Sequence, residues 1–307
     1  MKILKIFLSF ILSLILVFSA IVLQLSLSLK HDIFSSKFYL EKANSSKIYD
    51  KLEKSIDSNF FDYASKNKLP TNTTSDIISP LWIEQQFTTA INGIIPYALG
   101  KVDVLPVIDS KTPIDKFNLN LTKILAEKKL PMDNVVTAQK QEFLKSFKEI
   151  PFTESWNELH GDNLKVTLNY YRKYVSLLNN LPYISGFTLL ASMLLLFLTA
   201  SKLVSWKVWT GYSLIIGGLI PSITSFIISN SSIPNTYLTN NIPLTNSQIF
   251  PPKATIDLLT DIINSFLMGL AKYGAVLVFL GIAVILIVSL FDTKKDNIFW
   301  YKHKPLK

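Results

Sequence analysis

Four long apolar runs constrain this chain more than any other feature of its sequence. They cover residues 6–29, 183–200, 208–229 and 272–291. Because an α-helix rises about 1.5 Å per residue, about 20 residues cross the roughly 30 Å hydrocarbon core of a bilayer. Inside that core every backbone N–H and C=O needs an internal partner, and a single segment meets this need only as a helix. The sequence therefore predicts an all-α membrane protein with four transmembrane helices.

Composition agrees with this class and removes several kinds of chemistry. Of the 307 residues, 49% are hydrophobic and only 17% are charged, which is more apolar than an ordinary soluble protein. The chain has no cysteine. Disulfides, thiolate metal sites and cysteine nucleophiles are therefore excluded.

The distribution of lysine predicts which segments face the cytoplasm. The two ends and residues 201–207 carry nine lysines against two acids, whereas residues 30–182 carry 20 basic and 18 acidic residues. Cytoplasmic segments are enriched in Lys and Arg, so we expect an N-in/C-in protein of the cell membrane. Segment 1–5, the turn 201–207 and the tail 292–307 are then cytoplasmic, and residues 30–182 and 230–271 are extracytoplasmic. The net charge of +9 indicates anionic lipid at the cytoplasmic face as the partner, and not nucleic acid.

The first apolar run fits two alternatives, a retained signal anchor and a cleaved signal peptide. At 24 residues, segment 6–29 is longer than the usual apolar region of about 7–15 residues in a signal peptide. Phe18 also stands where a cleavage site of the A-x-A type prefers a small residue. These features favour an anchor, and cleavage remains open.

The segment between the first two runs has repeated helix signals. Apolar residues recur at helical spacing through Ser35–Lys66, with charges of both signs between them. Ser79 and Pro80 predict a helix start and Gly100 predicts its end, while Thr112-Pro113 opens another helix. We therefore expect a mainly helical extracytoplasmic domain over residues 30–182, large enough to bury its own core.

Two local patterns in this segment carry further predictions. Lys101–Ser110 alternates apolar and polar residues around Pro106, which predicts a short edge strand. Acidic and basic residues alternate between Lys47 and Asp57, which predicts a helix surface with several weak salt bridges.

Ionisable residues give no strong site. His31, His160 and His303 lie far apart and lack the helical spacing of zinc ligands. Glu154 and Glu158 lie one helical turn apart, but acid–base catalysis would need a cleft and a raised pKa, so an exposed helix face is the preferred interpretation. We predict no catalytic residue and no enzyme activity.

Three aspartates raise the question of a calcium site. Asp103, Asp109 and Asp115 recur every six residues, without the glycine-bearing loop that such sites use. Acids in turns and at helix N-termini are the preferred interpretation. We predict no metal site and no cofactor.

Polar and small residues inside the runs allow two interpretations. Gln24 is the strongly polar side chain of the first run, and the third run contains Gly217, Gly218 and Pro221. Broken helices can line substrate sites, but small residues more often let neighbouring membrane helices pack closely. The small residues of the fourth run, including Gly274 and Gly281, form a similar face. Packing is favoured at both places.

A local pattern resembles one found in uncharacterised bacterial four-span membrane proteins with a helical extracytoplasmic domain. It consists of Ser79–Gln86 (SPLWIEQQ), Ala90–Asn92, Tyr97–Gly100 and Val107–Asp109. The likeness in layout covers the whole chain, and the specific pattern covers residues 79–115. The resemblance implies the same fold and brings no known activity with it.

The layout is also similar to the permease subunit of the cell-division and macrolide-exporter type of ABC systems, which would imply a partner ATPase. Those permeases carry a cytoplasmic stretch before the first span and a coupling helix between the second and third. This chain offers five residues and a short turn. The leading hypothesis is a non-enzymatic envelope protein whose outer domain binds or organises surface components, with other envelope proteins as candidate partners. A permease-like or accessory subunit of a transport system is the alternative.

Overall fold

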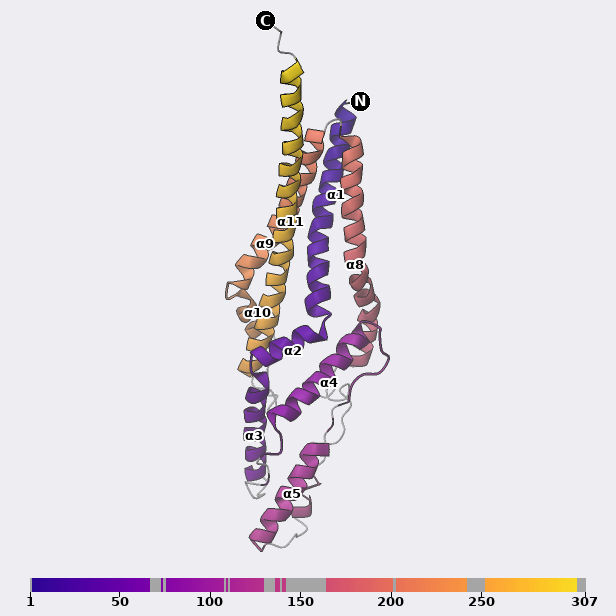
Figure 1. The fold of residues 1–307 in the computed structure, drawn as a ribbon. Coiled ribbons are helices and arrows are strands. Elements are labelled where there is room, and N and C mark those ends of the chain that lie inside the picture. The colour runs from indigo at the N-terminus through magenta and orange to yellow at the C-terminus, as the bar shows by residue number, and fades with distance from the viewer. Residues whose placement is uncertain are drawn as a thin grey trace. The chain divides into compact units, whose positions relative to one another are not determined.

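The elements of the described chain are helices (Figure 1). The computed structural model describes residues 2–66, 73, 76–107, 109, 111–129, 136–138, 140–141, 164–200, 203–241 and 252–302. Within these ranges the helices are α1 (Lys2–Ser28), the π-helical turn η1 (Leu29–Ile33), α2 (Ser36–Ser45), α3 (Ile48–Lys66), α4 (Pro80–Ala98), α5 (Lys111–Glu127), α8 (Leu164–Thr199), α9 (Leu203–Ser229), α10 (Ile233–Asn241) and α11 (Pro252–Lys302). These ranges contain no β-strand. The all-α fold class is confirmed for the part of the chain that the structure describes.

The chain folds into two compact units. The membrane unit consists of Met1–Ile33, Leu177–Pro234 and Ile263–Lys307. The second unit consists of Phe34–Ser176 and Asn235–Ile262. Each unit is therefore assembled from segments that lie far apart in the sequence.

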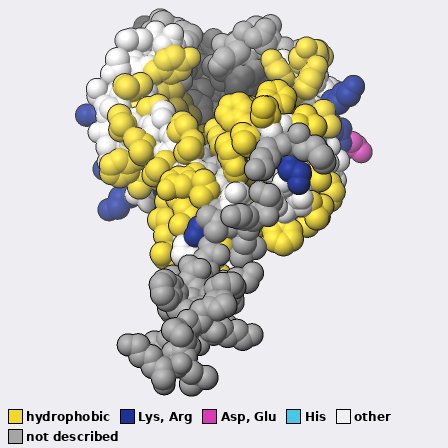
Figure 2. Space-filling model, turned by 90° about the horizontal axis from the view of Figure 1, so that it is seen from above, with side chains coloured by type: hydrophobic (Ala, Val, Ile, Leu, Met, Phe, Trp, Pro, Cys, Tyr) yellow, Lys and Arg dark blue, Asp and Glu magenta, His cyan; other side chains and the backbone are white. Residues whose placement is uncertain are grey.

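Four helices in the described ranges are long and apolar enough to cross a membrane, judged by length and composition. They are Ile3–Ile33, Lys165–Thr199, Ser205–Ser229 and Thr255–Leu290. Large apolar side chains such as Phe18, Phe187 and Phe279 point outward from them. Apolar side chains also occupy much of the described surface seen in Figure 2. A soluble bundle would place polar residues there, so the arrangement is compatible with a multi-pass membrane protein.

All four long helices contribute to the core of the membrane unit. Its buried residues are Leu12, Leu16, Ala20, Leu189, Leu196, Leu214 and Leu277. Ser13 contacts Ser213 at 2.5 Å and Gln24 contacts Gly217 at 2.7 Å, so α1 and α9 run in the same direction. Next to this bond, Gly218 of α9 closely approaches Gly274 of α11.

The connection between α8 and α9 is shorter than the predicted turn 201–207. Helix α9 already begins at Leu203, so Trp206 and Lys207 are helical, while residues 201 and 202 lie outside the described chain. The Trp206 indole Nε1 donates a hydrogen bond to the carbonyl oxygen of Met193 at 3.0 Å, and the ring meets Phe197 edge to face. This bond and the ring contact hold the first turn of α9 against α8, before the apolar run begins.

The second unit has its own core, formed by α2, α3, α4 and α5. Its buried residues are Ala43, Ile48, Tyr49, Leu52, Ala64, Ile77, Ile78, Ile83, Phe117, Leu121 and Leu125. Leu258 of α11 packs against this cluster. A helical core within residues 34–176 agrees with the periodicity of the sequence, and Leu258 adds a contribution from residues 235–262.

Local helix signals in the second unit hold with two refinements. The Ser79 side chain accepts a hydrogen bond from Trp82 N at 3.3 Å, and Gly100 adopts φ +74° just after α4, as the predicted start and stop require. Helix α4 continues through Pro96, although a proline inside a helix usually kinks or ends it. The expected helix over Ser35–Lys66 is divided into α2 and α3, because Lys47 adopts φ +52° between them.

Two predictions for this unit are wrong within the described residues. Segment 101–107 forms no strand, apart from an isolated bridge at Val107, because the chain bends at Asp103 and Pro106 packs on Gly93 of α4. The predicted salt bridges of α3 are also absent from the described side chains, where the ion pairs are Lys37–Glu41 and Arg172–Asp103. Lys51 and Lys54 of α3 are exposed to water, where an ion pair gains too little to hold two long side chains together.

Candidate functional site

A gap in the hydrogen bonding of α9 organises the polar interior of the membrane unit. Pro221 has no N–H, so the carbonyl group of Gly217, four residues earlier, lacks its helical donor. The Gln24 amide Nε2 of α1 donates to that carbonyl at 2.7 Å and to the Ala20 carbonyl at 3.2 Å. Gln24 is 0% exposed. The structure thus joins two sequence features that we had considered separately.

Glycines allow the backbones to approach around this bond. A Cβ added at Gly217 would lie 3.1 Å from the Val17 carbonyl oxygen, and one at Gly218 would lie 2.6 Å from the Gly274 carbonyl oxygen. The Ser222 hydroxyl donates to the Gly218 carbonyl at 2.7 Å and lies 3.2 Å from the Ala271 carbonyl oxygen. These contacts fill the space between the helices with backbone and short side chains.

Two glycine pairs give the α9–α11 contact its register. Gly211 and Gly218 of α9 are seven residues apart, as are Gly274 and Gly281 of α11. A Cβ at Gly281 would lie 2.7 Å from the Gly211 carbonyl oxygen, so Gly211 meets Gly281 just as Gly218 meets Gly274. The two helices are therefore antiparallel. We had not singled out Gly211, although the repeated seven-residue interval was visible in the sequence.

One polar atom at this contact has no hydrogen-bond partner. The Gln24 side-chain oxygen Oε1 is buried and unpaired. A Cβ added at Gly274 would lie 2.5 Å from it. Because a Cβ replaces one of glycine's two α-hydrogens, that hydrogen points toward Oε1, as in a weak C–H···O bond. The arrangement can join α1, α9 and α11, and it leaves little room for a ligand.

The π-helical turn at the end of α1 holds a second polar group. The Ser28 hydroxyl lies 2.8 Å from Asp32 Oδ2 and 3.0 Å from the Phe266 carbonyl oxygen. The His31 ring stacks at 6.2 Å on Tyr273 of α11. The described residues contain no group of three His, Cys, Asp or Glu able to hold a metal ion, while residues 160 and 303 lie outside them. The structure thus gives His31 an aromatic contact.

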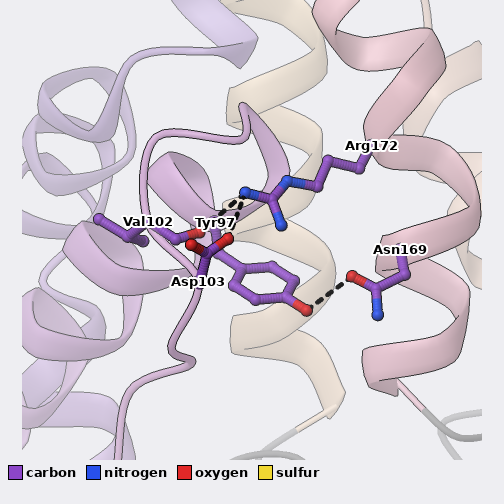
Figure 3. A network of polar contacts seen from close by, with 5 residues as sticks. All are labelled: Tyr97, Val102, Asp103, Asn169 and Arg172. Carbon is purple, nitrogen blue, oxygen red and sulfur yellow. Dashed lines mark hydrogen bonds and ion pairs between the residues drawn. The ribbon is translucent and has the colours of Figure 1, made fainter.

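A network around one arginine organises the chain after α4 in the second unit (Figure 3). Arg172 Nη2 of α8 donates to Asp103 Oδ1 at 2.8 Å and to the Val102 carbonyl at 3.3 Å. The guanidinium carbon lies 5.3 Å from the centre of the Tyr97 ring. The Tyr97 hydroxyl donates to Asn169 Oδ1 at 2.7 Å. These contacts join the end of α4 to the first turns of α8.

We had not singled out Arg172, although the sequence marks it. It is the only arginine among 31 basic residues. A planar guanidinium can donate in the plane while its face rests on an aromatic ring, which the ammonium group of a lysine cannot do. A Cβ added at Gly100 would also come within 3.1 Å of Arg172 Nε. The network therefore depends on an arginine and on a glycine.

The remaining candidate acids are placed as follows. The backbone N–H of Lys111 donates to Asp109 Oδ1 at 2.9 Å, so Asp109 stands at the start of α5. Asp115 is exposed within α5. Residues 154 and 158 lie outside the described chain. Asp103 and Asp109 thus serve the local structure, and among the described residues neither belongs to a group of acids able to bind a metal.

A further acidic group lies at the contact of α3 with the residues before α4. Burial raises the pKa of the Asp57 carboxyl to about 6, and the nearby charges of Glu53 and Asp76 add to the effect. Burial, with the charge of Glu84, also raises the pKa of the Tyr49 phenol. Asp57 Oδ1 is buried without a hydrogen-bond partner. The alternating charges of α3 predict salt bridges, but the ion pairs of the described chain lie elsewhere.

The fold is all-helical within the described ranges, and its four long apolar helices are compatible with a multi-pass membrane protein. A scan against protein-family models, a search of curated proteins and a search of solved structures each found no match.

Proposed function

We propose that the chain is a cell-membrane protein with four spans and cytoplasmic ends, whose second unit is extracytoplasmic. This unit binds or organises components of the cell envelope without catalysing a reaction. The observation that supports the topology most strongly is that two separate segments of the chain form the second unit. It combines Phe34–Ser176 with Asn235–Ile262, and Leu258 packs on a core whose other residues lie mainly between Ala43 and Leu125.

Two of the four apolar runs separate the two segments of the second unit in the sequence. Helices α8 and α9 contain these two runs. If each crosses the membrane once, a chain that leaves the membrane after α1 returns to the same side after α9. Both segments of the second unit then lie on one side, with the ends and the α8–α9 turn on the other. The nine lysines of the ends and the turn assign that other side to the cytoplasm.

The packing of α1 supports a retained signal anchor. Leu16, Ala20 and Gln24 are all 0% exposed. Removing α1 would take away the donor to the Gly217 carbonyl and leave that group unsatisfied in hydrocarbon. A signal peptide that is removed would not be expected to complete the hydrogen bonding of another helix. These contacts support the retention of the first helix in the mature protein.

The surface of the second unit supports a role in binding. Its polar contacts join Arg172 to Asp103 and Asp109 to Lys111, which holds the chain in place between α4 and α5. The apolar side chains of Val104 and Leu119 are exposed, at 77% and 64%. These two exposed apolar side chains are positions at which contact with another envelope component can be detected.

Site-specific photo-crosslinking tests this function. We expect a photoreactive amino acid at Val104 or Leu119 of the full chain, in native membranes, to give discrete adducts with other envelope components. The matched control is Leu198, which is exposed on the apolar face of α8 and is expected to give lipid adducts only. Adducts confined to lipid at all three positions would contradict a binding role for the second unit.

A further inference from the structure

One face of α3 gathers acidic groups against the start of α4. Tyr49, Glu53 and Asp57 follow at intervals of four residues and so share a helix face. Asp76 lies in the turn before α4 and adopts φ +57°. Asp76 and Glu53 both raise the pKa of Asp57, and Glu84 of α4 raises that of Tyr49. The charges that act on Asp57 and Tyr49 therefore come from α3 itself, from the exposed Asp76 before α4 and from α4.

The described lysines and arginine form no ion pair with these acidic side chains. The ion pairs of the described chain are Lys37–Glu41 and Arg172–Asp103, and both lie elsewhere. Lys116 of α5 reaches toward Asp76, but its Nζ donates to the backbone carbonyl at 3.3 Å. Lys51 and Lys54 of α3 are exposed to solvent. The repulsion between the carboxylates is therefore uncompensated by an ion pair.

The surroundings of Asp57 destabilise its ionised form. Its neighbours on α3 include Leu52, which is buried in the core, and Ile56, which packs against it. Its Oδ1 atom is buried and accepts no hydrogen bond. An ionised carboxylate there loses hydration without gaining a donor, whereas a protonated carboxyl is neutral and can itself donate.

We propose that the contact between α3 and residues 76–79 is a proton-operated clamp, which tightens when Asp57 binds a proton and loosens when it ionises. The device needs no other ligand, because the bound proton removes the repulsion from Glu53 and Asp76. Its use as a sensor of external pH rests on the proposed extracytoplasmic placement of the second unit. Its effect on stability does not.

The sign of the pH dependence follows from the raised pKa. A carboxyl whose pKa is about 6 when folded and about 4 when unfolded binds its proton more tightly in the folded state. The resulting stabilisation is complete below about pH 4 and is lost as the pH rises through about 6. A carboxylate held in an ion pair would give the opposite trend, since acid would weaken the fold.

Hydrogen exchange on the full chain in detergent micelles tests the clamp. We expect the opening equilibrium of α3 and the first turns of α4, corrected for intrinsic exchange rates, to be about three- to tenfold smaller at about pH 5 than at about pH 7.5. The lower part of this range allows for solvent screening of a partly exposed carboxyl. Equal or larger opening at the lower pH would overturn the proposal.

Three variants assign the effect to its residue. In Asp57→Asn the opening equilibrium should no longer depend on pH, and Glu53→Gln should reduce the dependence without abolishing it. Asp50→Asn is the matched control, because Asp50 lies exposed on the same helix, and it should behave as the native chain does. A native pH dependence in Asp57→Asn would overturn the proposal. The measurement gives the same answer on either side of the membrane, so it is independent of the proposed topology.

Discussion

Replacing Gly274 by alanine is expected to destabilise the membrane unit by about 2 kcal/mol. The added Cβ would overlap the Ser222 hydroxyl and lie 2.6 Å from the Gly218 carbonyl oxygen. The hydroxyl can rotate away, but the carbonyl belongs to the backbone of α9, so the two helices must separate. The loss should exceed the gain of about 1 kcal/mol that alanine brings to a helix. The free energy of unfolding of the full chain, measured in detergent micelles, checks this value.

Gly186→Ala is the matched control for this prediction. Gly186 also lies in a membrane helix, but its added Cβ would meet nothing closer than Leu23 Cδ1 at 3.9 Å, an ordinary contact. This variant should be neutral or slightly stabilised. Adding Ser222→Ala to Gly274→Ala should recover part of the loss and leave the part due to the Gly218 carbonyl. Equal stability of the two glycine variants would show that α9 and α11 do not approach as described.

Replacing Gln24 by leucine is expected to destabilise the same unit by about 1–2 kcal/mol. Leucine fills a similar volume in the core but removes the side-chain N–H that donates to the Gly217 carbonyl. That carbonyl then has neither the proline nitrogen nor the glutamine amide as a partner. Denaturant titration of the full chain in micelles measures the change.

A double-mutant cycle with Pro221 isolates the cause of this loss. Pro221→Ala restores an N–H four residues after Gly217, so α9 can satisfy the carbonyl by itself. Gln24→Leu should therefore cost less in the Pro221→Ala background than in the native chain. Additive effects of the two substitutions would contradict a shared hydrogen bond.

Much of the fold can be predicted from the sequence, because its strongest signals are local. Apolar runs long enough for a bilayer gave the four long helices, and the Ser79 cap with the Gly100 stop gave α4 nearly to its ends. These features depend on residues within a few turns of one another. The break at Lys47 was not predicted, because no glycine or proline marks it there.

The candidate sites could be predicted less well, because they depend on partners far apart in the sequence. Gln24 and Pro221 were each visible, but only the folded bundle brings Gln24 to the Gly217 carbonyl. Similarly, nothing near Arg172 in the sequence indicates that it meets Asp103. The charge pattern of α3 predicts salt bridges, whereas burial against the core removes part of the hydration of Asp57. Burial and tertiary contacts decide these cases.

The central claim is that the two segments of the second unit lie together outside the cell, with the α8–α9 connection inside. Because the chain has no cysteine, single cysteines at Ser45, Ser231 and Ser205 can be labelled with a membrane-impermeant maleimide. We predict that Ser45→Cys and Ser231→Cys react in intact cells, and that Ser205→Cys reacts only after permeabilisation. Labelling of Ser205→Cys from outside, or labelling of only one of the other two, would contradict the topology.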